Sequence, residues 1–385
     1  MPRTIELPHV KSPPHLEKLR EEVRQFIAEE LKAGSFEPEC DALMGGYNPE
    51  FTKKLAQKKW LGMTLPKEYG GHGRTALERF VVIEELLAAG TPLSAHWIAD
   101  RQSAPLLVHF GTEEQKQKFI PLIVKGELYF SVGLSEPNSG SDLASLSCSA
   151  KKVEGGWVLN GSKTWTSGAH HSHYMITLCR TSPRTENKHE GLSQLLVDLT
   201  SMGITIRPIY FMNGDHHFNE VIFEDVFIPD NMVIGRIGYG WQQANTELAY
   251  ERSGPERYLS TYPLLIELIR VLQEKGQDER VQIALGELTA QLWTLRKMSF
   301  GVAMLLEDGA NPHIEAALVK DLGTRFEQNI VEAARSMVAS TPSMTASTQY
   351  TKLLTQALFH STLFTLRGGT TEIMRGIIAR GLVGR

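Results

Sequence analysis

The chain has 385 residues, too many for one ordinary hydrophobic core, so two or three domains are expected. Apolar residues make up 42% and charged residues 22%, which is ordinary for a soluble globular protein. The formal net charge of −4 gives no electrostatic reason to bind nucleic acid or an anionic membrane. No apolar run approaches the ~20 residues that span a bilayer. The widely spaced Cys40, Cys148 and Cys179 indicate reduced thiols in a cytoplasmic protein.

Residues 1–126 are predicted to be almost entirely helical. The first helical stripe contains Leu19, Val23, Phe26 and Ile27. Further helices are expected over residues 49–59, 76–89 and 93–110. The glycine-dense segment Leu65–Gly73 lacks the dinucleotide-binding glycine spacing and a preceding strand, so a plain loop is favoured over a phosphate-binding loop. Thr112 and Gln115 form a capping-box pattern that opens a helix ending near Gly126.

From residue 129 to about residue 235 the pattern changes to short β-rich runs with a period of two. Examples are Tyr174–Leu178, Ser193–Val197 and Glu220–Phe223. The adjacent His216 and His217 suggest a metal site, but neighbouring residues on a strand point to opposite faces and no cysteine cluster accompanies them. No metal is therefore expected.

After Gly240 the chain is predicted to be helical to its end. Apolar residues follow a seven-residue spacing from Val281 to Leu306, and a four-residue spacing from Leu318 to Ala334. These two stripes indicate long helices packed side by side in a bundle. The order predicts an α+β chain with a helical domain (1–126), a β domain (127–236) and a helical bundle domain (237–385).

The candidate functional loop follows a short strand that begins at Phe130. Pro137 lacks an amide proton and Gly140 allows unusual backbone angles, so the strand must end there. Ser135 and Ser141 then place hydroxyls beside exposed backbone amides, which suits a polar or anionic ligand.

A second candidate segment spans Gly156 to Ala169. Asn160-Gly161 between two β-prone runs predicts the turn of a β-hairpin. Trp165 and Ser167 on the following strand are expected to share one face, because side chains alternate along a strand. Taken by themselves, the two segments predict a β-hairpin with a polar loop of ligand size, and Trp165 alone is better interpreted as a core aromatic.

Together, the two segments resemble the acyl-CoA dehydrogenase family. The family pattern is a Thr/Ser-Glu-Pro-x-x-Gly-Ser-Asp loop followed by an Asn-Gly-x-Lys-x-Trp-x-Thr/Ser strand, and Ser135–Asp142 and Asn160–Ser167 match it in order. The resemblance covers nearly the whole chain. It implies an N-terminal helical domain, a middle antiparallel β-barrel-like domain and a C-terminal four-helix bundle.

The resemblance also implies a flavoenzyme that holds FAD and removes two hydrogens from an acyl-CoA thioester, passing the electrons to an electron-transfer flavoprotein. Leu134 and Ser135 would meet the flavin ring, Trp165 would cover it, and the Ser167 hydroxyl, where the family usually has Thr, would lie near N5. Ser141 would lie close to both flavin and CoA. Two residues of the closing signature, Thr370 and Glu372, would touch the cofactor.

The catalytic base is expected on another helix. Many family members place a glutamate immediately before the Gly-Thr pair of the closing signature, where this chain has Gly368. Isovaleryl-CoA dehydrogenases instead use the Glu of a Glu-Arg pair, which here is Glu251-Arg252. Pro255 cannot continue the helical hydrogen bonding, so the helix should break within a turn of Glu251. An exposed helix glutamate is the ordinary alternative. Arg252 and Gly368 are candidate substrate-binding residues.

Other functions remain open at this point: a flavin oxidase or monooxygenase of the same fold, or a non-catalytic flavin-bearing scaffold. A homo-oligomer, most simply a tetramer, is implied by the family, although its Arg-x-x-Phe contact has no clear match near Arg270. The missing side chain at Gly368 suggests branched or bulky acyl groups. Asp100 and Arg101 could mark a polar group in the acyl pocket, or form a pair that faces solvent.

Overall fold

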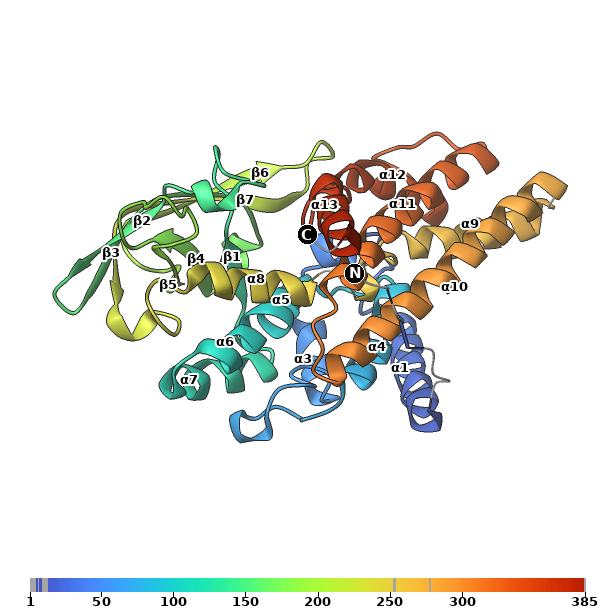
Figure 1. The fold of residues 1–385 in the computed structure, drawn as a ribbon. Helices are drawn as coiled ribbons and strands as arrows, with labels where there is room; N and C mark the ends of the chain where they lie inside the picture. Colours follow the sequence, from blue (N-terminus) through green and yellow to red (C-terminus); the bar gives the residue numbers. More distant parts are fainter. Residues whose placement is uncertain (1–4, 6, 9–12, 252–253, 277, 384–385) are drawn as a thin grey trace. The chain divides into compact units, whose positions relative to one another are not determined.

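The protein is described by a computed structural model that covers residues 5, 7–8, 13–251, 254–276 and 278–383 (Figure 1). The chain divides into two compact units. The first, called the sheet unit below, comprises residues 47–73 and 93–251; the second, the bundle unit, comprises residues 1–46, 74–92 and 252–385. Each unit is described by itself. The division into three domains stays a prediction.

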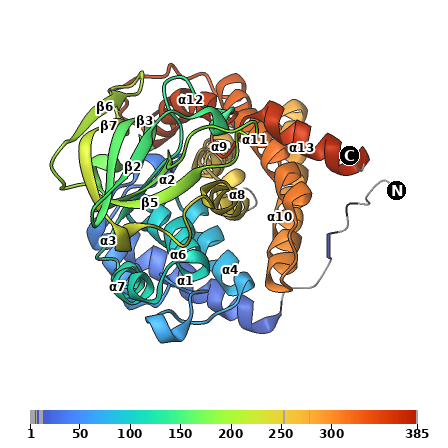
Figure 2. The same ribbon diagram turned by 60° about the vertical axis from the view of Figure 1, so that its left-hand side comes forward.

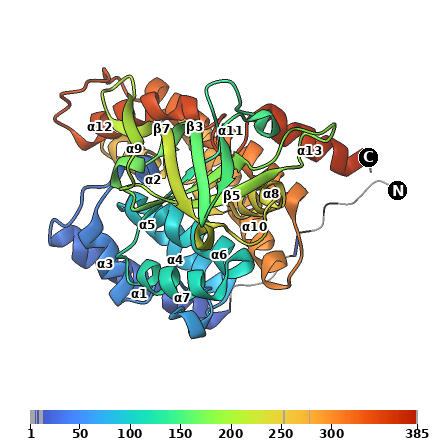
Figure 3. The same cartoon turned by 90° about the vertical axis from the view of Figure 1, so that its left-hand side faces the viewer.

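The sheet unit contains one seven-stranded sheet. Its strands are β1 (Phe130–Gly133), β2 (Ser149–Val153), β3 (Gly156–Ser167), β4 (Tyr174–Arg180), β5 (Leu192–Asp198), β6 (Ile204–Tyr210) and β7 (His216–Pro229). They lie in the order β1-β4-β2-β3-β7-β6, with β5 paired to β4. Figure 3 shows β3 beside β7. All pairs are antiparallel except β1–β4 and a single-residue contact between β2 and β4.

Helices complete the sheet unit. They are α3 (Pro49–Gln57), α5 (Ser94–Ile98), α6 (Ala104–Phe110), α7 (Glu113–Val124) and α8 (Gly240–Glu251). The predicted capping box at Thr112 and Gln115 is confirmed at the start of α7. Phe119 of α7 packs edge-to-face on Phe130 of β1, with ring centroids 5.9 Å apart, inside one buried apolar cluster. This packing fixes the strand from which the functional loop leaves.

The hairpin turn predicted at Asn160-Gly161 is wrong. Strand β3 runs through these residues, and the turn between β2 and β3 is at Glu154-Gly155, where Gly155 has φ +71°. At Gly161 the pairing with β7 shifts by a bulge, and φ is +134°. A Cβ atom on Gly161 would lie 2.7 Å from the Cα of Cys148. The glycine therefore serves a close backbone approach within the sheet rather than a turn.

The bundle unit is all-helical. Its helices are α1 (Pro14–Lys32), α2 (Ala42–Gly45), α4 (Ala76–Ala88), α9 (Tyr262–Lys275), α10 (Glu279–Glu307), α11 (His313–Met337), α12 (Gln349–His360) and α13 (Thr371–Val383). Helix α11 packs against α9, α10 and α13, and α10 packs against α4 (Figure 2). Both predicted stripes are confirmed as long helices. On α10, Leu288, Leu295 and Val302 are buried at intervals of seven residues.

The predicted α+β organisation, with helical ends and a β-rich middle, is thus confirmed. Across the described ranges, no helix is both long enough and apolar enough to cross a membrane.

Candidate active site

The loop after β1 lies along strand β3 of the sheet unit. The main-chain amide of Thr164 donates to the carbonyl oxygen of Ser135 at 2.9 Å. Leu134 and Ser135 are half-buried, and Glu136 is buried. Ser141 is exposed at the far end of the same loop. The two sequence segments that carry the family pattern are therefore neighbours in space.

A buried ion pair joins the loop to β3. The Lys163 ammonium, which is 0% exposed, donates to Glu136 Oε1 at 2.8 Å and to the Leu134 carbonyl oxygen at 2.9 Å. Burial alone would raise the pKa of Glu136, but the Lys163 charge and the main-chain amides of Ser147 and Cys148 hold it below its ordinary value. The sequence interpretation missed this pair. The available signal was the lysine of the second motif together with the glutamate of the first.

Trp165 stands on a bulge in β3. The pairing with β7 shifts between Lys163 and Thr166, and Trp165 has φ +57°. Its side chain is 56% exposed and touches only the edge of Phe218 among the aromatic rings of the described chain, at 5.7 Å between centroids. Thr166 is buried and Ser167 is half-buried. Trp165 and Ser167 thus flank one buried residue, and Trp165 is not a core aromatic.

These residues fit a flavin. A large indole left exposed by a backbone bulge is available to pack against a planar ring, and its exposure is otherwise unfavourable. The hydroxyls of Ser135 and Ser167 make no side-chain hydrogen bond within the described ranges, so both can bond a ligand. The Leu134–Ser135 loop adds main-chain groups on the neighbouring segment. Of the five predicted flavin-contact residues of the sheet unit, Leu134, Ser135, Trp165 and Ser167 lie on these two neighbouring segments, and Ser141 lies at the exposed end of the loop.

Glu251 is the last residue of α8, and its side chain lies outside the described part of the chain, as does all of Arg252. The predicted helix break is confirmed, because α8 ends at Glu251 and a 3-10 turn occupies Pro255–Arg257. One turn before Glu251, the buried Glu247 accepts a hydrogen bond from Gln194 Nε2 of β5 at 3.1 Å. This bond ties α8 to the sheet.

The closing signature lies in the bundle unit. Gly368 and Gly369 have φ +66° and +96°, and Thr370 Oγ1 accepts from the amide of Ile373 at the start of α13. A Cβ atom on Gly368 would lie 3.0 Å from the guanidinium carbon of Arg257. The room expected beside Gly368 is therefore taken up by the Arg257 side chain. Glu372 is exposed.

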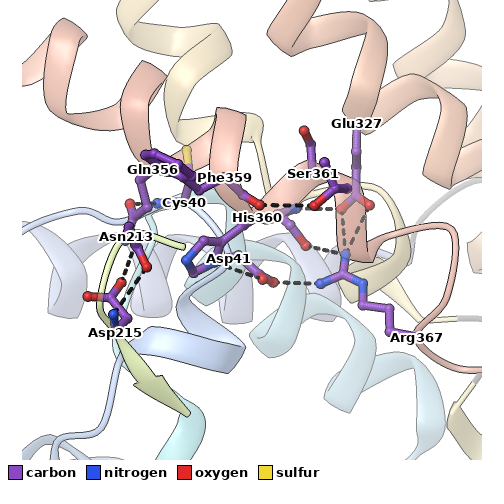
Figure 4. Close-up of polar contacts among 12 residues, drawn as sticks. Cys40, Asp41, Asn213, Asp215, Glu327, Gln356, Phe359, His360, Ser361 and Arg367 are labelled. Carbon is purple, nitrogen blue, oxygen red and sulfur yellow. Dashed lines mark hydrogen bonds and ion pairs between the residues drawn. The ribbon is translucent and has the colours of Figure 1, made fainter. Parts of the chain in front are cut away.

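A buried network holds the residue before Gly368 (Figure 4). The Arg367 guanidinium donates to Asp41 Oδ1 at 2.5 Å, to Glu327 Oε2 at 3.0 Å and to Ser260 Oγ at 2.7 Å. His360 Nδ1 lies 3.2 Å from Asp41 Oδ2. Despite burial, the charges of Arg367 and His360 lower the pKa of Asp41. The network fixes the backbone from which the glycine turn starts.

Lys320 of α11 is, like Lys163, fully buried. Its Nζ has no hydrogen-bond acceptor among the described residues. Burial lowers the pKa of Lys320 to about 8, helped by repulsion from Arg257 and Arg367.

Two further sequence candidates are resolved in part. Asp100 and Arg101 lie in a π-helical segment (Ala99–Ser103) between α5 and α6, and both are buried, so they do not form a pair facing solvent. Asp100 Oδ1 accepts from the amide of Gly62 at 2.5 Å, and Arg101 stacks over Trp97. Whether they line an acyl pocket stays a prediction.

Three histidines of the sheet unit, His170, His171 and His216, lie close together. His170 and His216 are 3.8 Å apart between ring centroids, and His171 stacks on Tyr47 at 3.7 Å. Burial, with repulsion from His171 and His216, lowers the pKa of His170 to about 4. His217 is buried whereas His216 is only half-buried. No group of three or more metal-ligating side chains occurs within the described ranges.

Comparison with known proteins gives a match along the whole chain. Models of the N-terminal, middle and C-terminal domains of acyl-CoA dehydrogenases match residues 13–127, 131–226 and 238–383. Acyl-CoA dehydrogenase FadE29 of Mycobacterium tuberculosis is 32% identical over 95% of this chain and 96% of its own length. FadE34 of the same organism is 34% identical over 86% of this chain, but the match spans only 45% of that longer protein. Mitochondrial isovaleryl-CoA dehydrogenase of Solanum tuberosum is 27% identical over 95% of this chain and 90% of its own.

Solved structures agree. The Tcur3481-Tcur3483 steroid ACAD superposes with a TM-score of 0.85 at 27% identity, over 98% of this chain and 99% of the other. A chain of the ChsE4-ChsE5 complex from Mycobacterium tuberculosis superposes with a TM-score of 0.82 at 27% identity, over the same shares of the two chains.

Proposed function

As the chain belongs to the acyl-CoA dehydrogenase family, an oxidoreductase family, we propose that it is an FAD-dependent enzyme that removes the α and β hydrogens of an acyl-CoA thioester. The observation that carries the proposal is the exposed Trp165 on its bulge beside the Leu134–Ser135 loop, a surface built for a flat ligand. Family members are flavoproteins, which makes the flavin the natural occupant.

Several residues of the chain are proposed to contact the cofactor, each at a different part. Leu134, Ser135, Trp165 and Ser167 would hold the ring system, and Ser141 would face both cofactor and CoA. Thr370 and Glu372 of the bundle unit would add contacts from the closing signature. When bound, FAD supplies the acceptor for the β-hydrogen and its electron pair.

Glu251 is proposed as the base that takes the α-proton onto a carboxylate oxygen. Its place at the end of α8, next to a 3-10 turn, supports the role, because irregular backbone often accompanies functional sites. Gly368 cannot take a proton, and Arg257 fills the space beside it. Arg252 and Gly368 remain proposed substrate contacts. Transfer of a proton to a positioned carboxylate is commonly worth ~10²–10⁴-fold in rate.

For the substrate we infer a branched or bulky acyl group. The support is the base proposed on the Glu-Arg helix and the likeness to a protein described as a steroid ACAD. The room expected beside Gly368 adds no support, because Arg257 occupies it. Arg257 beside Gly368 places a cation where an aliphatic wall would suit a plain fatty acyl chain. An electron-transfer flavoprotein is the proposed electron acceptor.

A homo-oligomer, most simply a tetramer, is proposed from the exposed face of α10. Ile283, Gly286, Ala290 and Trp293 are all exposed and follow a spacing of three and four residues along the helix. Small residues between two large apolar ones allow another helix to approach closely. Sedimentation of the FAD-loaded protein as a stable monomer would contradict this assembly.

The test is a panel of straight, branched and ring-containing acyl-CoA thioesters, assayed with an artificial electron acceptor. The purified protein should be yellow and should release FAD on denaturation. Turnover should be fastest with a bulky thioester, and reduced enzyme with product bound should reoxidise slowly in air. Release of FMN, or no flavin binding at all, would overturn the cofactor. Rapid reoxidation by oxygen would assign a flavin oxidase instead.

A further inference from the structure

The flavin loop, defined as Leu134–Glu136, is joined to β3 at every residue. The Leu134 carbonyl and the Glu136 carboxylate both accept from Lys163 Nζ, at 2.9 and 2.8 Å. Between them, the Ser135 carbonyl accepts from the amide of Thr164 at 2.9 Å. Three consecutive loop residues are thereby bound to two consecutive strand residues, immediately before Trp165.

The lysine reaches the loop because Gly133 has no side chain. A Cβ atom on Gly133 would lie 3.1 Å from Lys163 Cγ and would overlap the methyl group of Met175. The side chain of Lys163 therefore crosses β1 directly over a glycine. This explains a glycine inside a strand, where it otherwise costs stability.

Glu136 extends the connection to a third segment. Its carboxylate accepts from the amide of Ser147 at 2.7 Å, from Ser147 Oγ at 2.9 Å and from the amide of Cys148 at 3.0 Å. With Lys163, the carboxylate has four donors and is buried. The carboxylate charge is therefore balanced by Lys163 and by three further hydrogen bonds. The pair joins the flavin loop, β3 and the residues that precede β2.

We propose that the Lys163–Glu136 pair positions the flavin loop, so that Leu134 and Ser135 are held in register with Trp165 and Ser167. Lys163 and Glu136 are positioning residues, since they act through the loop carbonyls. The proposal rests on the proposed function, because it takes FAD as the ligand of the loop. Stability alone does not require a buried ion pair, because apolar residues of similar volume commonly replace one with no loss of stability. The pair is retained for the geometry that it imposes.

The experiment compares Lys163→Met, the double variant Lys163→Met/Glu136→Leu, and Lys163→Arg with the wild-type holoenzyme. It measures the thermal midpoint, the affinity for FAD and the visible absorption spectrum of bound FAD. Lys163→Met should lower the midpoint strongly, because Glu136 is left buried without its cation. The double variant should recover the midpoint. It should nevertheless bind FAD about 10- to 100-fold more weakly, the effect of losing one hydrogen bond from a charged group, with an altered spectrum.

Recovery of both wild-type FAD affinity and the wild-type spectrum in the double variant would overturn the proposal and leave the pair a structural feature. If the double variant does not fold, Lys163→Arg decides. It keeps the charge next to Glu136, but its planar guanidinium cannot reproduce the geometry of an ammonium that bridges two oxygens. Weakened FAD binding with a near-wild-type midpoint is expected, and wild-type FAD affinity would contradict the proposal.

A matched control is available on the same sheet. Lys152 of β2 pairs with Asp230 at 2.5 Å, and both side chains are about half exposed. Lys152→Met should change neither the midpoint nor the spectrum appreciably, because exposed pairs contribute little. Failure of the proposed function would be seen in the wild-type protein itself, which would then bind no FAD and show no flavin spectrum. Failure of the present proposal would be seen only in the variants.

Discussion

Two lysines of the described residues, Lys163 and Lys320, are completely buried, and their surroundings differ. Lys163 in the sheet unit has a carboxylate and a carbonyl as acceptors, whereas Lys320 in the bundle unit has no acceptor within the described chain and lies near two arginines. A buried ammonium is costly unless it is paired. The difference shows that Lys163 belongs to a fully hydrogen-bonded framework, whereas Lys320 is buried without an acceptor among the described residues, near Arg257 and Arg367 and with Glu327 and Asp321 as the opposing charges.

The largest expected effect is on turnover, and it comes from Glu251, which belongs to neither of these two buried lysine environments. Glu251→Gln should keep FAD and substrate binding and lower turnover by ~10²–10⁴-fold, because an amide cannot take the α-proton. Rapid-mixing measurements of flavin reduction would show this. Glu247→Gln is the control, since it removes the same charge one turn earlier on α8 from a carboxylate already bonded to Gln194. A large loss in the control with none in Glu251→Gln would move the base to Glu247.

The second-largest effect is expected on stability, when the buried ion pairs of Arg367 in the bundle unit are broken. Arg367→Met leaves Asp41 and Glu327 buried without their shared cation, so the free energy of unfolding should fall by about 3–5 kcal/mol. Chemical denaturation measures it. Arg335→Met is the control on α11, where the Arg335–Glu332 pair is exposed and should be worth at most ~1 kcal/mol. Equal losses in both variants would show that burial of the network contributes nothing.

Replacing the buried Lys320 by an apolar residue should stabilise the protein. In the unfolded chain Lys320 titrates near 10.5, but in the folded chain near 8, so the folded state binds fewer protons between these values. The free energy of unfolding should therefore rise with pH from about 8 to about 10.5. Lys320→Met should abolish this rise and be more stable at neutral pH, by at most ~3 kcal/mol. A parallel pH dependence in wild type and variant would show that Lys320 is not perturbed.

The smallest effect tests the contact between Gly368 and Arg257. Gly368→Ala should cost ~1–2 kcal/mol for its positive φ, plus a further amount because the new Cβ would lie 3.0 Å from the guanidinium. Gly34→Ala isolates the first part, because Gly34 has φ +69° and nothing within 4 Å of the added atom. The excess should vanish in the Arg257→Ala background, as measured by denaturation. If Gly368→Ala still loses more stability than Gly34→Ala in the Arg257→Ala background, Arg257 is not the cause of the difference.

Periodicity and capping were enough to predict most elements from the sequence. The seven-residue stripe of α10 and the Thr112 capping box are local patterns, and both were found. Asn160-Gly161 was misinterpreted because the same dipeptide occurs in turns and in bulges, and only the approach of Cys148, the residue before β2, decides between them. Local sequence cannot contain that information.

The candidate site divides in the same way. Trp165 and Ser135 were identifiable because they lie within a recognisable local pattern. Arg257, Lys320 and the Asp41–Arg367 pair were not, since Asp41 and Arg367 are 326 residues apart and meet only through the packing of the bundle. Lys163 is the intermediate case: it lay inside the pattern, but its partner and its burial became visible only in the structure.

The most direct test of the central claim is an anaerobic single-turnover experiment with FAD-loaded wild-type protein. A bulky acyl-CoA thioester should bleach the oxidised flavin absorbance, and mass spectrometry should find the thioester lighter by two hydrogens in an amount equal to the enzyme. Flavin that stays oxidised with every thioester of the panel, while a chemical reductant still bleaches it, would contradict the assignment as an acyl-CoA dehydrogenase.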